Sequence, residues 1–118
     1  MTRHDPIVSI RQMLEFASKA QRLGEGLPAD RIENDELLSL ALPHAIEIIG
    51  EAANRIPEEE RLRFPAIPWS QAIRMRNRLA HGYDTVDFNL VAATIRDDIP
   101  PLIAALEAIL RAVDDGGV

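Results

Sequence analysis

Apolar side chains recur every three to four residues along most of this chain, which is the spacing expected of amphipathic α-helices. Ile7, Ile10, Leu14 and Ala17 show this spacing near the start of the chain, and residues 102–110 show it near the end. The alternating pattern typical of half-buried β-strands is scarce, and no internal repeat or low-complexity tract is present. The sequence therefore predicts an all-α bundle of four to five helices.

Capping residues and helix breakers locate the first two main helices. The first begins with Asp5 as N-cap and Pro6 at the first helical position, and it ends at Gly24 and Gly26. The second runs over residues 35–55 after a polar segment at 30–34. We expect Pro43 to kink it, because proline removes one backbone donor, and we expect the helix to end before Pro57.

The third and fourth main helices follow a proline-containing connector at residues 64–68. The third covers residues 69–81, with Gly82 in the position where glycine commonly ends a helix. The fourth begins near Asp87 and continues to about Val113, and Pro100-Pro101 should bend or break it after Ile99. The last residues, 114–118, are expected to form a frayed tail.

Length and composition limit the classes of function. The 118 residues are expected to form one domain, 1–118. No stretch approaches the roughly 18 apolar residues of a membrane span and no signal region is evident, so we expect a soluble, cytoplasmic protein with no membrane partner. With no cysteine in the chain, thiolate zinc sites and cysteine nucleophiles are excluded.

The distribution of charge is uneven. The net charge of −6 argues against a protein that coats nucleic acid in general. Residues 61–83, however, contain five arginines and no carboxylate. This segment predicts either a local basic patch or an ordinary solvated arginine face.

The stretch Arg76-Asn77-Arg78-Leu79-Ala80-His81-Gly82-Tyr83 carries the chemistry most typical of a functional site. On a helical wheel Arg76 falls among apolar residues of the third helix, so it requires a carboxylate, a second subunit or an anionic ligand. Asn77 lies one turn before His81 and could orient the imidazole. Arg76 and His81 diverge by about 140° on an ideal helix, so either the helix end unwinds or a twofold dimer supplies the second group.

An arginine and a histidine can cleave RNA without a metal ion. Arg76 would hold the phosphate, His81 would act as general acid or base, and the 2′-hydroxyl of the substrate would be the nucleophile. On the polar arc of the same helix, Arg74 and Arg78 are candidates for RNA contacts. A histidine before a C-terminal glycine is also an ordinary helix ending, so a purely structural role stays open at this point.

Several blocks of residues together resemble a known family. Residues 65–69 (PAIPW) and 75–83 (MRNRLAHGY) resemble HEPN-domain proteins of the HepT-like toxin group, and residues 45–57 (AIEIIGEAANRIP) are similar to the other signature of that family. The order of the four helices and the length match across nearly the whole chain. One departure is Asp84-Thr85, where the family often has an aromatic residue and a glycine, and it bears on the shape of the loop and on recognition by the partner.

The resemblance implies a homodimeric, metal-independent endoribonuclease that needs no cofactor and acts as the toxin of a prokaryotic toxin–antitoxin pair. Arg76 and His81 would be its active residues, and the RNA substrate would be tRNA or mRNA. Its partner would be a minimal nucleotidyltransferase antitoxin that transfers AMP to Tyr83. An alternative is a non-catalytic HEPN binding module that sits beside a nucleotidyltransferase.

Acidic residues of the second helix complete the candidates. His44, Glu47 and Glu51 lie along one edge of that helix, which allows a metal site, although the other helices offer no matching ligands. We expect instead that Glu47 or Glu51 pairs with a buried Arg76 or lines the cleft. Glu51 is therefore a supporting candidate.

Overall fold

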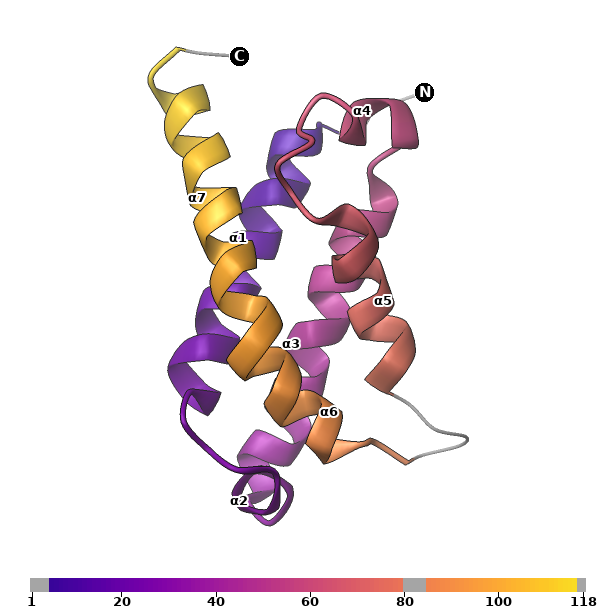
Figure 1. Ribbon diagram of the computed structural model, residues 1–118, viewed down its shortest axis with the longest axis vertical. Coiled ribbons are helices and arrows are strands. Elements are labelled where there is room, and N and C mark those ends of the chain that lie inside the picture. The colour runs from indigo at the N-terminus through magenta and orange to yellow at the C-terminus, as the bar shows by residue number, and fades with distance from the viewer. Residues whose placement is uncertain (1–4, 80–84, 117–118) are drawn as a thin grey trace.

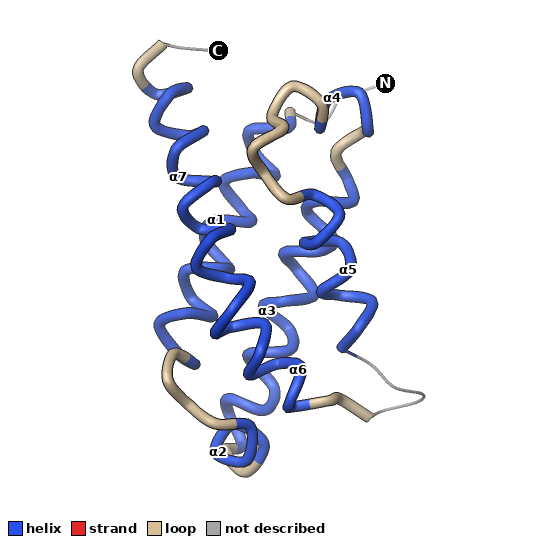
Figure 2. Tube along the Cα trace, in the orientation of Figure 1, coloured by secondary structure: helices blue, strands red, loops and turns tan. Residues whose placement is uncertain are grey.

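The chain folds into an elongated bundle of α-helices measuring 44 × 28 × 20 Å (Figures 1 and 2). The structure is a computed structural model and describes residues 5–79 and 85–116. In chain order the elements are α1 (Pro6–Gly24), α2 (Ala29–Glu33), α3 (Glu36–Arg55), α4 (Glu58–Arg61), α5 (Trp69–Leu79), α6 (Phe88–Ala93), the π-helical segment η1 (Thr94–Asp98) and α7 (Ile99–Asp114). No β-strand occurs among the described residues, so the all-α fold class is confirmed.

Aspartates begin three of the helices, as the sequence predicts. The side chain of Asp5 accepts a hydrogen bond from the N–H of Ile7, and Asp35 accepts from Leu37 and Leu38. Asp87 accepts in the same way from two N–H groups at the start of α6. Each carboxylate satisfies donors that a helix start leaves without a partner, which is why the predicted starts at Asp5, about Asp35 and near Asp87 agree with the structure.

α3 lies at the centre of the packing. α1 packs against α3 and α7, and α5 packs against α3 on another side. Their buried faces meet in one hydrophobic core that includes Ile10, Ile46, Ile49, Leu102 and Leu106. None of the described helices contains a stretch long and apolar enough to cross a membrane.

Two short helices do not follow from the sequence pattern. α2 has five residues and α4 has four, too few to show a helical period or to be stable alone. Packing holds α2, because the side chain of Ile32 is completely buried in the core. The segment at 30–34 expected to be a polar linker is therefore a helical turn.

The prolines of the last helix act differently from the prediction. The helix is α-helical from Ile99 onward, and the disturbance lies before that residue, in the π-helical segment η1. Pro100 and Pro101 have no N–H to donate to the preceding turn, and a wider turn accommodates the missing donors. The expected break after Ile99 is thus wrong in position. α3, by contrast, is α-helical on both sides of Pro43.

Candidate functional site

Helix α5 carries the part of the arginine–histidine motif that the structure describes. Trp69, Ala72, Met75 and Leu79 form its buried face, which lies against α3. His81 and Tyr83 lie outside the described residues. The chain leaves α5 at Leu79 and is again beside it at Asp87, whose backbone N–H donates to the carbonyl of Leu79 at 3.0 Å. The described residues Leu79 and Asp87, on either side of residues 80–84, are therefore held together.

A glycine of α3 lies directly beneath Arg76. A Cβ atom placed on Gly50 would lie 2.6 Å from the Cβ of Arg76 and 3.2 Å from the backbone carbonyl oxygen of Ala72. Both distances are shorter than ordinary van der Waals contact, so no larger residue fits between the two helices as they stand. The absence of a side chain at Gly50 lets the backbone of α3 approach α5 at the level of Arg76.

The guanidinium of Arg76 is not buried within one chain. Arg76 is exposed, and so are Glu47 and Glu51. No hydrogen bond or ion pair joins Arg76 to any residue in the ranges 5–79 and 85–116. The expected pair between a buried Arg76 and Glu47 or Glu51 is thus wrong for a single chain: only the base of the side chain packs against Gly50, and its end reaches solvent. A second subunit or an anionic ligand stays available as the partner.

The opposite flank of α5 contacts the π-helical segment. The side-chain amide of Gln71 donates to Asp98 at 2.9 Å. Burial raises the pKa of Asp98 above its ordinary value of 3.8, and the positive charge of Arg78 opposes this shift. Sequence patterning gave no sign of Asp98, because its position depends on the π-helical turn that brings η1 against α5.

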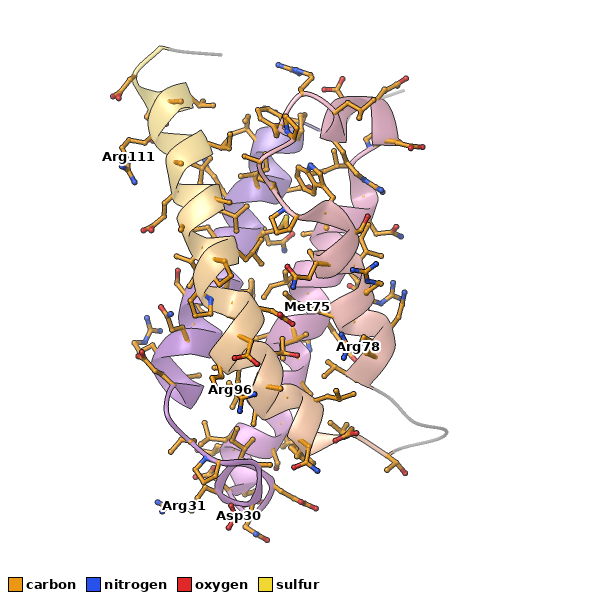
Figure 3. All side chains as sticks on the ribbon, viewed as in Figure 1. Asp30, Arg31, Met75, Arg78, Arg96 and Arg111 are labelled. Atoms are coloured by element: carbon orange, nitrogen blue, oxygen red, sulfur yellow. The ribbon has the colours of Figure 1, made fainter. Side chains whose placement is uncertain are left out.

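Three arginines of α5 are exposed: Arg74, Arg76 and Arg78 (Figure 3 labels Arg78). Arg74 and Arg78 lie one turn apart on one side of the helix, and we call these two the arginine face. Arg76 lies about 160° away around the helix, on the side next to Gly50 of α3. None of the three forms an ion pair with a carboxylate of the described residues. Asn77 is exposed on the same helix, and its expected contact with His81 lies outside the described residues.

The other two arginines of the basic segment are engaged in local contacts. Arg63 forms an ion pair with Glu60 at 2.8 Å and lies over the ring of Phe64. The Nε of Arg61 donates to the carbonyl of Ile56 at 2.8 Å. Arg61 and Arg63 therefore shape the turn after α4, and the arginines without such contacts are Arg74, Arg76 and Arg78.

The exposed side of α3 combines apolar and polar residues. Leu37 and Leu40 are 76% and 71% exposed, respectively. His44, Glu47 and Glu51 follow them on the same side. Within the described part of the chain, no group of three or more histidine or acidic side chains is arranged to hold a metal ion, so the alternative of a metal site on α3 gains no support.

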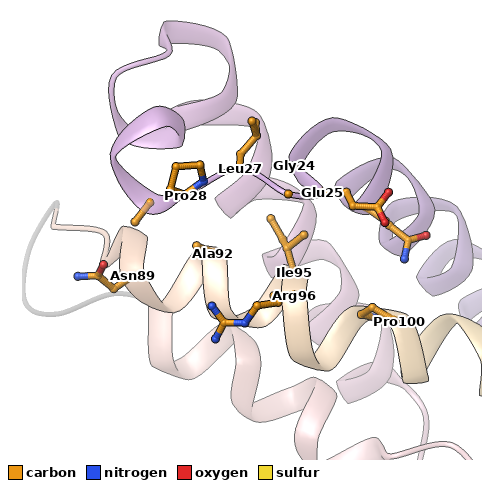
Figure 4. Close-up of a pocket in the computed structure, with 12 residues that line it drawn as sticks. Gly24, Glu25, Leu27, Pro28, Asn89, Ala92, Ile95, Arg96 and Pro100 are labelled. Atoms are coloured by element: carbon orange, nitrogen blue, oxygen red, sulfur yellow. The ribbon is translucent and has the colours of Figure 1, made fainter.

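A separate cavity lies away from the motif helix. It has a volume of about 490 Å³ and lies between the end of α1, the segment before α2, and α6 with η1. Figure 4 shows Leu27, Ile95 and Pro100 among the residues that line it. None of the predicted site residues that the structure describes lines this cavity.

Comparison with known proteins gives consistent results. The sequence model of the family described as Ribonuclease HepT-like matches residues 13–109. A protein of Thermococcus cleftensis named "Probable ribonuclease HepT" is 39% identical over 77 residues, which are 65% of this chain and 70% of the relative. A protein of Methanocaldococcus jannaschii named "Putative RNase MJ1380" is 28% identical over 109 residues, 92% of this chain and 100% of the relative. No solved structure gives a significant match.

The contact at Gly50 leads to a prediction about stability. Gly50→Ala should lower the free energy of unfolding by about 1–2 kcal/mol, because overpacking against backbone costs about 1–3 kcal/mol and the better helix propensity of alanine offsets part of it. Urea unfolding followed by circular dichroism measures the change. Gly24→Ala is the matched control. Its new methyl group would meet the flexible ends of the Ile95 and Leu42 side chains, so Gly24→Ala should lower the free energy of unfolding by less than Gly50→Ala does. A Gly50→Ala protein as stable as the parent would contradict the close approach.

The raised pKa of Asp98 leads to a prediction about pH. Because the folded chain holds this proton more tightly than the unfolded chain, the contribution of Asp98 to stability is present at low pH and is lost as pH rises through its folded pKa. Asp98→Asn keeps an acceptor for Gln71 but cannot ionise. The variant should therefore not show the loss of stability that the ionisation of Asp98 causes above about pH 4. Unfolding midpoints measured across pH test it.

Asp97 supplies the control for that experiment. A hydrogen bond from Arg96 lowers the pKa of Asp97, so this contribution is present at neutral pH and is lost on acidification. Asp97→Asn should therefore shift the pH dependence in the opposite direction. The same profile for both variants would show that the burial of Asp98 has no effect on stability.

Proposed function

The chain belongs to the Ribonuclease HepT-like family, and we propose from this premise that it is a metal-independent endoribonuclease that cuts RNA with Arg76 and His81. The observation that carries the proposal is the set of three exposed arginines on α5: Arg76 beside α3, and Arg74 and Arg78 on the arginine face. None of them forms an ion pair with a described carboxylate. Unpaired guanidinium groups at an exposed position are suited to bind phosphate oxygens in pairs.

Arg76 is the phosphate-binding residue of this proposal. Its base is fixed against Gly50 while its guanidinium is free to reach a ligand, so binding orders few further bonds of the side chain. A guanidinium positioned in this way stabilises the additional negative charge that develops on the phosphorus oxygens in the transition state. Arg74 and Arg78, on another side of the helix, contact phosphates farther along the strand, and these contacts fix the strand without reading its sequence.

His81 moves the proton in this reaction. The 2′-hydroxyl of the substrate loses its proton and attacks the adjacent phosphorus, the bond from phosphorus to the 5′-oxygen breaks, and that oxygen takes up a proton. The products are a 2′,3′-cyclic phosphate and a free 5′-hydroxyl, so atoms and charge balance without an added nucleophile. An imidazole near neutral pH can carry out either proton transfer, and Asn77 would hold it in position.

A twofold dimer would bring two copies of this helix into one cleft. Leu37 and Leu40 of α3 are large apolar side chains left in solvent, on the same side of that helix as Glu51. Burying them against a second copy would be favourable, and an interface that continued along this side of α3 would bring Glu51 and Arg76 of both chains to it. The charge of Arg76 would then have its partner across the dimer or on the RNA phosphate.

The biological setting proposed is a toxin–antitoxin pair. A minimal nucleotidyltransferase would act as the antitoxin and transfer AMP to Tyr83, two residues after His81. The added phosphate would compete with RNA phosphate for the arginine face, and the bulk of the nucleotide would obstruct the cleft. Inhibition would thus need no change in the fold of the bundle.

Cleavage of RNA in excess chelator tests the activity. The unmodified protein should cut a pool of tRNA and mRNA under these conditions, and Arg76→Ala and His81→Ala should each reduce the rate by at least about a hundredfold. Arg22→Ala, a change of an exposed arginine on α1, is the control for lost surface charge and should cut like the parent.

Folding and mass of the same proteins complete the test. Both active-site variants should keep the helical spectrum and the dimeric mass of the parent in light scattering. A monomeric mass for the parent would overturn the shared cleft. No cutting under any condition would favour the alternative, a binding module beside a nucleotidyltransferase.

Modification of Tyr83 is tested by mass. Protein produced together with its neighbouring nucleotidyltransferase should be heavier by whole AMP units, and Tyr83→Phe should remain at the unmodified mass while it still cuts RNA. Intact-mass spectrometry measures both. Modification that persists in Tyr83→Phe would place the acceptor elsewhere.

A further inference from the structure

A groove lies at the start of α5, at the other end of the helix from His81. It has a volume of about 630 Å³ and lies between the turn after α4 and the first turns of α5. The residues that give it its character are Leu62, Pro65, Ile67, Pro68, Trp69 and Arg74. Since Arg74 also belongs to the arginine face, the groove is continuous with the proposed RNA-binding surface.

Hydrogen bonds to backbone carbonyls fix the walls of the groove. The indole N–H of Trp69 donates to the carbonyls of Arg61, at 3.0 Å, and Phe64, at 3.1 Å. Arg61 in turn donates from Nε to the carbonyl of Ile56. These contacts hold the turn after α4 against α5, so the groove is formed before any ligand binds.

The surface of the groove suits a flat apolar ligand that carries negative charge. Leu62 is 74% exposed, although it is large and apolar, and proline rings flank it in the groove wall. Arg63 is neutralised by Glu60, whereas Arg74 makes no ion pair with a described residue. Arg61 and the exposed carboxylate of Glu58 also line the groove, which therefore combines apolar walls with two arginines and one acidic residue.

The position of the groove along α5 matches a strand that continues from the arginine face. Arg74 and Arg78 lie one turn apart on the same side of the helix, about 6 Å along its axis. A nucleic acid strand that contacts Arg78 reaches Arg74 next and then the groove. Single-stranded RNA is recognised by unstacked bases that stack on aromatic side chains or arginine planes. In this groove Trp69 is buried, and the exposed surface offered to a base is that of Leu62 and the prolines, next to the guanidinium of Arg74.

We propose that this groove is a subsite for one unstacked base of the RNA, with Arg74 on the phosphate of that nucleotide. The inference rests on the proposed function and adds to it a contact outside the cleft. A base bound in the groove orients the RNA strand along α5. It also makes the RNA bind more tightly than a sugar–phosphate chain of the same length without bases.

The experiment compares two non-cleavable ligands of equal length and charge. One is a fluorescein-labelled oligoribonucleotide with 2′-O-methyl riboses, and the other is the same chain with abasic riboses. Fluorescence anisotropy gives both dissociation constants over a range of salt concentrations. The parent protein should prefer the chain that carries bases by about threefold, less than the roughly fivefold or more gained by stacking on an aromatic side chain, because the exposed groove wall is aliphatic.

Variants assign this preference to the groove. Leu62→Asn, a neutral change at an exposed position, should reduce the preference at least about twofold to threefold, while Leu23→Asn, an exposed leucine on α1, should leave it unchanged. Arg74→Ala should weaken binding of both chains and lower the slope of log affinity against log salt by about one. Arg22→Ala is the control for that slope.

The outcomes separate this inference from the proposed function, because cleavage of the unmodified RNA is measured in parallel. A preference that depends on Leu62, in a protein that cuts no RNA, supports the subsite and overturns the ribonuclease activity. Cleavage together with a preference unaffected by Leu62→Asn overturns the subsite alone and leaves the groove to a protein partner. Absence of RNA binding overturns both.

Discussion

The close approach of α3 and α5 at Gly50 is the constraint on which the candidate site depends. A Cβ atom added to Gly50 would lie only 2.6 Å from the Cβ of Arg76, so the backbone of α3 meets the base of the arginine side chain with nothing between them. This contact sets the height and the rotation of α5, and hence where each residue of the motif projects. It also explains how an arginine can lie at the edge of an apolar face: its base packs, and its charge stays in water.

The second flank of α5 is set by an irregularity of the last helix. The prolines at 100 and 101 follow the π-helical turn η1, and η1 brings Asp98 to Gln71 of α5. α5 is thus held by α3 on one side and contacted by η1 on the other, and its third side faces solvent with the arginine face. A rigid helix with one free, basic side is a suitable support for a phosphate site, because positioned donors need no reordering when the ligand binds.

The main helices were predictable because their signals are local. An aspartate cap and an apolar period depend on residues within one or two turns, so the starts at Asp5, Asp35 and Asp87 agree with the structure. The short helices α2 and α4 were not predictable, because helices of this length depend on packing against the rest of the fold. The π-helical turn was not predictable either, because it depends on how the backbone accommodates the missing N–H groups of Pro100 and Pro101. The family was evident from the sequence for a different reason, since the motif residues occur in a fixed order along the chain.

The sequence by itself determined the all-α fold class, the limits of the main helices and the concentration of arginines on one of them, because composition, caps and period are properties of neighbouring residues. Only the tertiary structure decided which arginines are exposed and free of ion pairs, and so available to bind a ligand. A helical wheel places Arg76 on the apolar side, but it carries no information on the facing helix, where Gly50 leaves its base room and its end reaches solvent. In the same way, Arg63 is paired and Arg74 is not because the turn after α4 brings Glu60 to one and an open groove to the other.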